Sequence, residues 1–194
     1  TTTVFGESDD DITVSDTSIG FSTFGGFGRD TITGSVNGDL IYGNQSVDSI
    51  IGGNGNDTLF GGQNDGPVGS DGFRRGGTET VRGGNGEDVI YGNHGNDVLF
   101  GDAGNDSIFG GQNDDTLSGG AGADVLFGNL GNDSMISGNS NDILYEVSGI
   151  DTLDGETGSD TLYVSNNTSA TAYYDDTESN SNGTDALYLG YGST

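Results

Sequence analysis

The chain has 194 residues, of which 39 are glycine, 31 are acidic and only 4 are basic, giving a formal net charge of -27. Self-repulsion at this charge opposes collapse unless counter-ions bind, and a hydrophobic fraction of 29% is small for an ordinary core of this length. The composition disfavours a nucleic-acid or anionic-membrane partner, because both need basic surface. The lack of Cys excludes disulfides. No apolar run is long enough for membrane insertion.

The N-terminal segment, residues 1–24, combines an acidic cluster with short apolar pieces. The cluster is Asp9-Asp10-Asp11, and apolar residues follow at Ile12 and Val14 and again from Phe21 to Phe24. Solenoids need caps to cover their open ends. The segment therefore indicates either an N-terminal cap or degenerate copies of the repeat that follows it.

A nine-residue phrase repeats through residues 25–163, and Gly52–Phe60 (GGNGNDTLF) is a clean copy. The template is G-G-x-G-x-D-x-U-x, in which U is a large aliphatic residue. Its first six positions supply flexible backbone and one carboxylate, and its last three supply a short strand. Rows begin at Gly25, Gly34, Gly43, Gly52 and Arg74, and then at every ninth residue from Gly83 to Gly155. Such a period is typical of a stacked solenoid whose turns bind calcium.

The repeat is interrupted at residues 61–73. The chain begins a row at Gly61, leaves the pattern near Pro67, and resumes it at Arg74. Pro67 is the single proline of the sequence, and proline beside glycine marks loops. We interpret this segment as an excursion loop that leaves the solenoid and returns to it.

The C-terminal segment, residues 164–194, is rich in Asn, Ser and Thr. Two short pieces in it resemble strands, at Thr171–Tyr174 and at Ala186–Leu189. The segment indicates a cap over the second open end of the solenoid. A secretion-signal region is the alternative interpretation, and both roles can coexist in the same residues.

The rows from Gly25 to Tyr163 resemble the RTX (repeats-in-toxin) calcium-binding nonapeptides of bacterial secreted proteins. The resemblance implies an all-β fold, the parallel β-roll or β-solenoid, with two nonapeptide rows per turn and terminal caps. It also implies multiple Ca²⁺ ions between loops stacked on the same edge. An extracellular location, secreted or at the bacterial cell surface, follows from the same resemblance, usually through type I secretion.

The resemblance also implies which residues bind calcium. Stacked loops lie two rows apart, and the position-six carboxylates share each ion with loop carbonyls. The implied carboxylates are Asp30, Asp39, Asp48, Asp57, Asp88, Asp97, Asp106, Asp115, Asp124, Asp133, Asp142, Asp151 and Asp160. The implied carbonyl-bearing loop positions include Gly84, Gly86, Gly101, Ala103, Gly110, Gln112, Gly120 and Gly122. Calcium prefers such hard oxygen ligands. Asp can also act as a turn former, but aligned carboxylates would repel one another without a cation between them.

Three of the four arginines, Arg74, Arg75 and Arg82, lie beside the interruption. Either a guanidinium replaces a calcium ion among the carboxylates there, or these side chains only solvate the insertion. The late rows at Ser137 and Glu146 lose glycines from the loop. We therefore expect weak calcium binding in those rows.

In the strand half of each row, position eight should point inward and positions seven and nine outward, because side chains alternate along a strand. Outward position nine carries Tyr91, Phe109, Phe127, Tyr145 and Tyr163 on alternate rows. These rings should form a ladder on one sheet face with a spacing of about 4.8 Å. The ladder is either an assembly face or a consequence of the preference of strands for aromatic residues.

The sequence favours a secreted, calcium-binding structural or assembly protein that folds on binding extracellular calcium. A surface layer, sheath, filament or adhesion module would fit, with self-association as the expected interaction. The alternative is the calcium-folded C-terminal secretion or folding domain of a larger type I-secreted enzyme or toxin. We expect no enzymatic activity, since the lone His94 lies at a variable loop position and no zinc or nucleophile motif occurs.

Overall fold

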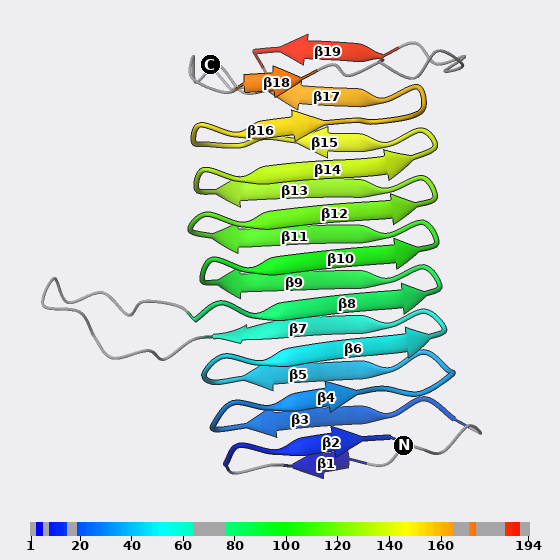
Figure 1. The fold of residues 1–194 in the computed structure, drawn as a ribbon, viewed down its shortest axis with the longest axis vertical. Helices are drawn as coiled ribbons and strands as arrows, with labels where there is room; N and C mark the ends of the chain where they lie inside the picture. The colour runs from blue at the N-terminus through cyan, green and yellow to red at the C-terminus, as the bar shows by residue number, and fades with distance from the viewer. Residues whose placement is uncertain are drawn as a thin grey trace, which may run out of the picture.

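The computed structural model describes residues 3–5, 8–14, 19–63, 77–164, 171–173 and 185–190. Within these ranges the chain forms β-strands and no helix. Successive strands alternate between two sheets that face each other and stack into one tall column (Figure 1). Neighbouring strands in each sheet are parallel, and each complete turn contains two rows. This arrangement confirms the expected parallel β-roll.

The odd-numbered strands form a ten-stranded sheet and the even-numbered strands a nine-stranded sheet. The first contains β1 (Thr3–Phe5), β3 (Ser22–Gly26), β5 (Leu40–Asn44), β7 (Thr58–Gln63), β9 (Val89–His94), β11 (Ser107–Gln112), β13 (Val125–Leu130), β15 (Ile143–Tyr145), β17 (Thr161–Val164) and β19 (Ala186–Leu189). The second contains β2 (Asp11–Thr13), β4 (Thr31–Thr33), β6 (Ser49–Asn54), β8 (Thr80–Asn85), β10 (Val98–Ala103), β12 (Thr116–Ala121), β14 (Ser134–Asn139), β16 (Thr152–Asp154) and β18 (Thr171–Tyr173).

The core is a double column of position-eight side chains between the two sheets. Each of them is at most 1% exposed, because the residues on both sides along the strand point the other way. The column contains Ile32, Ile41, Ile50, Leu59, Val81, Ile90, Leu99, Ile108, Leu117, Leu126, Met135, Leu144, Leu153 and Leu162. The inward orientation expected for position eight is therefore what the structure has.

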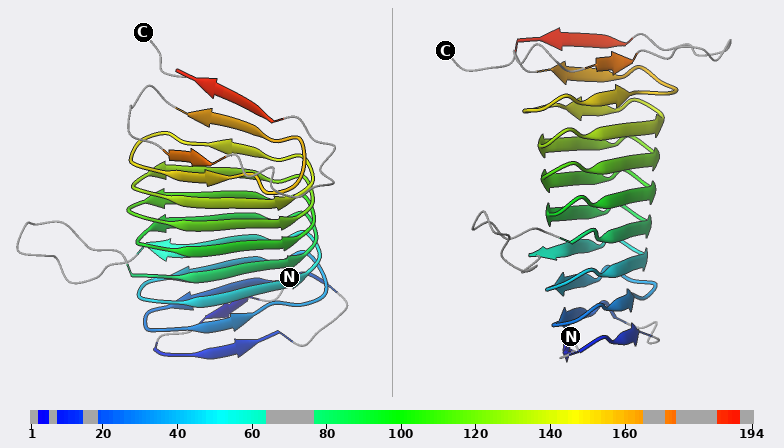
Figure 2. Two further views of the ribbon diagram at one scale, coloured as in Figure 1. Left: turned by 45° about the horizontal axis from the view of Figure 1, so that its top comes forward. Right: turned by 60° about the vertical axis from the view of Figure 1, so that its left-hand side comes forward.

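Strands extend both ends of the repeat (Figure 2). At one end, β1 pairs with β3 and β2 pairs with β4, so the described parts of residues 1–24 add to both sheets. At the other end, β18 pairs with β16 and β19 pairs with β17. The β19 residue Leu187 lies opposite the core residue Leu162 and is 37% exposed. Of the expected C-terminal strand pieces, Tyr174 lies outside the described residues.

The interruption falls inside a row instead of between two rows. Gly62 pairs with Asn93 as part of β7, and Gly77 forms a bridge with Gly95 at position four of its row. The interrupted row thus consists of residues 61–63 followed by 77–82, whereas the sequence suggested a break at 61–73 and a new row at residue 74. The segment between the two halves, residues 64–76, lies outside the described residues.

Position one of the interrupted row is closely packed. An ideal Cβ on Gly61 would lie 3.1 Å from the carbonyl oxygen of Gly92 in the next turn. Arg74, the row start obtained by counting nines, would carry a long side chain at that position. Counting alone could not distinguish the two solutions, because both restore the same phase at Glu79.

Candidate calcium sites

The position-six acids form two vertical ladders, one along each edge of the roll. In each ladder, a carboxylate Oδ1 accepts a hydrogen bond from the backbone N–H of the acid one turn earlier, at 2.6–2.9 Å. The first ladder contains Asp39, Asp57, Asp88, Asp106, Asp124, Asp142 and Asp160. The second contains Asp30, Asp48, Glu79, Asp97, Asp115, Asp133 and Asp151.

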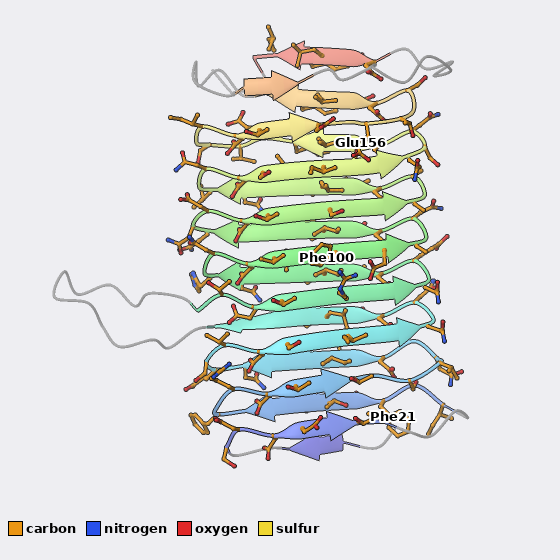
Figure 3. All side chains as sticks on the ribbon, viewed as in Figure 1. Phe21, Phe100 and Glu156 are labelled. Atoms are coloured by element: carbon orange, nitrogen blue, oxygen red, sulfur yellow. The ribbon has the colours of Figure 1, made fainter. Side chains whose placement is uncertain are left out.

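The first ladder continues across the interruption, because the Asp57 N–H donates to Oδ1 of Asp88 at 2.7 Å although 31 residues separate them. In the second ladder, the Thr80 N–H donates to the Asp48 carbonyl at 3.0 Å and so places Glu79 above Asp48. The structure therefore brings together carboxylates from both sides of the break. The loop side chains that surround them line both edges of the stack (Figure 3).

The second oxygen of these carboxyl groups is buried and, with one exception, accepts no hydrogen bond. The exception is Asp39. The orphaned oxygens are Oδ2 of Asp30, Asp48, Asp57, Asp88, Asp97, Asp106, Asp115, Asp124, Asp133, Asp142, Asp151 and Asp160, together with Oε1 of Glu79 and Oδ2 of Asp10. A buried carboxylate oxygen without a partner is costly. A cation beside each of these oxygens would remove that cost.

Backbone oxygen lies next to the orphaned carboxylate oxygen. An ideal Cβ on Gly110 would be 2.6 Å from Oδ2 of Asp115 and 2.8 Å from the carbonyl oxygen of Gly128 in the next turn. Within the described ranges, no group of three or more His, Cys, Asp or Glu side chains gathers into a metal cluster. A calcium ion bound here would therefore take most of its six to eight oxygen ligands from loop carbonyls and water.

Burial and crowding of the carboxylates favour their neutral form when no cation is present. The pKa of Asp115 is raised to about 8, mainly by burial; the hydrogen bond from the Asp97 N–H opposes the rise, and the Asp97 and Asp133 carboxylates add to it. Burial likewise raises the pKa of Asp124 to about 7 and that of Asp106 to about 6. At neutral pH the Asp115 carboxyl would therefore hold a proton unless a metal ion replaced it, whereas Asp106 would be mostly ionised.

The loop positions expected to supply carbonyls adopt the turns that the repeat requires. Gly84 and Gly120, at position two, have φ of +113° and +112°, in the left-handed region that favours glycine. Carbonyls at position three already accept one hydrogen bond each: Ala103 from the Gly86 N–H at 2.8 Å, and Gln112 from the Gly95 N–H at 3.2 Å. A carbonyl oxygen has a second lone pair, so these groups could still contact an ion.

Position five carries further hydrogen bonds between turns, made by asparagine side chains, which were not expected from the sequence. The Asn105 side-chain oxygen accepts the N–H of Ala123 at 2.8 Å, and Asn141 accepts that of Ser159 at 2.9 Å. Here the later turn donates to the earlier one, which is the opposite direction to the position-six ladder. The repeated Asn before the position-six Asp, as in Asn96-Asp97 and Asn132-Asp133, was the available signal.

Arg82 lies away from the buried carboxylates. Its guanidinium donates to Oδ1 of Asp102 at 2.7 Å and sits 4.1 Å from the ring centroid of Phe100. Phe100 projects from the middle of the stack (Figure 3), and both residues occupy outward position nine of the nine-stranded sheet. The hypothesis that a guanidinium replaces calcium is thus not supported for Arg82. Arg74 and Arg75 lie outside the described residues.

Ser137 fills position one of its row with a hydroxyl group where most other rows have glycine. The side chain is fully buried, and its Oγ donates to the Gly155 carbonyl at 3.0 Å. One lone pair of a carbonyl in the next turn is thereby used by the protein itself. This contact gives a physical basis for the weak calcium binding expected in this row.

The comparison with protein families agrees with this geometry. The family model described as the RTX calcium-binding nonapeptide repeat matches residues 24–45, 33–66, 75–108, 109–144 and 147–166. These matches cover more than half of the chain, which therefore belongs to the RTX calcium-binding nonapeptide repeat family. Calcium is its ligand, and proteins with these repeats are typically secreted. No curated protein matches the chain. Within the described part, no helix is long and apolar enough to cross a membrane.

Proposed function

We propose that this chain is a structural module of an extracellular protein, that calcium folds it, and that it associates with further copies of itself. The ions would lie between stacked loops, held by the position-six carboxylates and by loop carbonyls. The role is structural and not enzymatic. The observation that carries the assembly role is the outer face of the ten-stranded sheet.

That face carries one continuous ladder of stacked aromatic rings. Successive ring centroids are 4.5–5.0 Å apart, and neighbouring ring planes are within 17° of parallel. The ladder contains Phe24, Tyr42, Phe60, Tyr91, Phe109, Phe127, Tyr145, Tyr163 and Tyr188. It includes the five rings expected from the sequence and extends beyond them at both ends, across the interrupted row.

The same face carries no charged residue among its described outward positions. Position seven in this sheet holds Ser22, Leu40, Thr58, Val89, Ser107, Val125, Ile143, Thr161 and Ala186. The outer face of the nine-stranded sheet, in contrast, includes Asp11, Arg82 and Asp154. In a chain of net charge -27, the uncharged face is where a second copy can approach with the least repulsion.

The geometry of the ladder also favours a second copy as the occupant. Each inner ring is covered on both faces by its neighbours, so the rings present their edges to the outside. A second copy carries the same 4.5–5.0 Å repeat and can therefore match the ladder row by row. Apart from Tyr188, the rings are half-buried by their stacking, and a continuous apolar stripe of this kind on an outer face favours association.

Replacing two rings in the middle of the ladder tests the assembly role. The double variant Phe109→Ser/Phe127→Ser should keep the β-sheet circular dichroism signal in calcium, because position nine points outward. In sedimentation velocity, the unmodified chain should self-associate and the double variant should not. The matched control, Phe100→Ser/Ile136→Ser, removes two outward residues of the opposite sheet and should associate like the unmodified chain.

Two results would count against the assembly role. If the unmodified chain in calcium stays a strict monomer at high concentration, the proposal fails. The alternative role, a calcium-folded secretion or folding domain of a larger secreted enzyme or toxin, would then be the better account. Equal loss of association in both double variants would show that the ladder is not the contact surface.

A further inference from the structure

Asp39 differs from the other position-six acids of the two ladders. Its Oδ2 accepts the backbone N–H of Ser35 at 2.6 Å, and its Oδ1 accepts the N–H of Phe21 at 2.7 Å. The Ser35 hydroxyl lies a further 3.2 Å from Oδ1. Both carboxylate oxygens thus have protein donors, whereas the Oδ2 of each other aspartate of the described ladders is buried and accepts no hydrogen bond.

The row departs from the template at positions two and four, where Ser35 and Asn37 replace glycine and neither has a positive φ. One turn later on the same edge, position two is Gly53 with φ of +117°, and in the turn after that it is Gly84 with φ of +113°. Ser35 stands at this position and is not among the residues with positive φ. Its peptide N–H is instead directed at the carboxylate of its own row. Glycine adopts the left-handed conformation at less cost than serine, so the substitution favours the altered turn.

The serine side chain also closes the loop on itself. The Ser35 hydroxyl donates to the Asn37 carbonyl at 3.2 Å and accepts the Asn37 N–H at 3.1 Å. Ser35 is only 8% exposed, so these contacts lie inside the loop and not on its surface. The loop therefore has internal hydrogen bonds where the other loops leave oxygens without donors.

The preceding turn on this edge also lacks an acid. Phe21 occupies the place of the position-six residue there and is 7% exposed; it lies near the N-terminal end of the stack (Figure 3). It supplies an N–H to Asp39 but no carboxylate. The first loops of this edge thus contain fewer anionic oxygens than the loops above them, and one of their carboxylates is already hydrogen-bonded.

We infer that Ser35 replaces a calcium ion at Asp39, so that loop 34–39 is held by the protein's own hydrogen bonds and binds no metal. A cation placed beside Oδ2 of Asp39 would meet the positive end of the Ser35 N–H dipole. The sequence-based assignment of Asp39 as a ligand rested on its phase in the repeat, which it shares with the position-six aspartates whose Oδ2 accepts no hydrogen bond. The inference concerns ion binding alone and is independent of the proposed self-association.

Counting bound ions by isothermal titration calorimetry and equilibrium dialysis tests this assignment. Ser35→Gly restores the Gly-Gly start of the repeat and allows position two to adopt the left-handed turn found at Gly53 and Gly84. This variant should bind a single additional calcium ion per chain. Ser35→Ala keeps a backbone N–H and a Cβ at the same position. It should bind the same number of ions as the unmodified chain, because the turn and not the hydroxyl excludes the metal.

A second pair of variants tests the inference without altering Ser35. Asp39→Asn should leave the number of bound ions unchanged at saturating calcium. Asp57→Asn, one turn higher on the same edge and with an orphaned Oδ2, should lose an ion. Loss of an ion in Asp39→Asn equal to that in Asp57→Asn would overturn the inference, and so would a folded Ser35→Gly chain with no additional ion.

Discussion

The backbone N–H of Asp88 donates to Oδ1 of Asp106, one turn away, at 2.8 Å. One oxygen of the Asp106 carboxylate thereby ties two loops together, while its Oδ2 is buried and accepts no hydrogen bond. The same arrangement recurs at the other aspartate rungs of both ladders, apart from Asp39. The hydrogen-bonding oxygen sets the stacking of the turns, and the free oxygen creates the demand for a cation.

Removing calcium should unfold the roll at neutral or higher pH. The core is narrow, and many buried carboxylates would be left without counter-charge, so ion binding should supply much of the folding free energy. We expect far-ultraviolet circular dichroism to show no β signal in EDTA at pH 8. Added calcium should restore it cooperatively, with a midpoint on the order of 0.1–1 mM, as in extracellular calcium modules. A full β spectrum in EDTA at this pH would refute the role of the ions.

Substitutions of Asp106 should separate its two functions. Asp106→Asn keeps an acceptor for the Asp88 N–H but removes the charge, so it should raise the calcium midpoint. Asp106→Ala also leaves that buried donor unsatisfied, at a further cost of about 1–3 kcal/mol. Calcium titrations followed by circular dichroism measure both effects.

Two controls accompany this experiment. Glu156→Gln removes one carboxylate from an exposed loop position and should leave the midpoint nearly unchanged. His94→Ala should shift the midpoint less than Asp106→Asn, because His94 supplies no position-six carboxylate and acts on Asp97 through its charge. Midpoint shifts in these controls as large as that of Asp106→Asn would contradict the assigned register.

The periodicity of the sequence was sufficient to predict the parts of the fold that depend on alternation and stacking. Position eight is buried from Ile32 to Leu162, and Asp88 lies beneath Asp106, because a nine-residue period places equivalent residues in equivalent positions. The ladder of rings was underestimated. The expected ladder included only rings after the interruption, although β7 continues the same sheet and places Phe60 next to Tyr91.

The remaining differences depend on local backbone geometry, which a period does not describe. The interrupted row starts at Gly61 and not at Arg74, as the pairing of Gly62 with Asn93 and of Gly77 with Gly95 shows, and a count of nines does not reveal this. Asp39 has the phase of a calcium ligand, yet the turn at Ser35 directs an N–H at it. Because the φ of Ser35 is not left-handed, its N–H occupies the oxygen that a calcium ion would otherwise contact. The repeat template does not distinguish this change from any other substitution at position two.

The core column should tolerate truncation far less well than the outer columns. Leu117 at position eight is fully buried, so Leu117→Ala should lower the free energy of unfolding in calcium by about 2–5 kcal/mol. The adjacent Ser118 points outward, and Ser118→Ala should change stability by less than about 0.5 kcal/mol. Urea unfolding monitored by circular dichroism at fixed calcium compares the two. Similar losses would mean that the two positions are not on opposite faces.

The calcium-free chain should be more stable in mild acid than at alkaline pH. Burial first, and then neighbouring carboxylates, raise the pKa of Asp57 and Asp115 to about 8 in the folded chain. An unfolded Asp titrates near 3.9. Between these values the folded state holds more protons than the unfolded state, so its stability is present at low pH and is lost as the pH rises toward about 8.

Calcium should show the opposite pH dependence, because it competes with those protons. A site must release its proton before its carboxylate can bind the ion, so the calcium midpoint should fall as the pH rises from 6 to 8, by up to about tenfold per unit for each proton released. Circular dichroism in EDTA at pH 5.5, 7 and 8.5 measures the first trend, with the β signal and any thermal transition expected to be largest at pH 5.5. Calcium titrations at pH 6 and 8 measure the second. Stability in EDTA that increases with pH, or a midpoint independent of pH, would show that the buried carboxyl groups are not protonated in the ion-free roll.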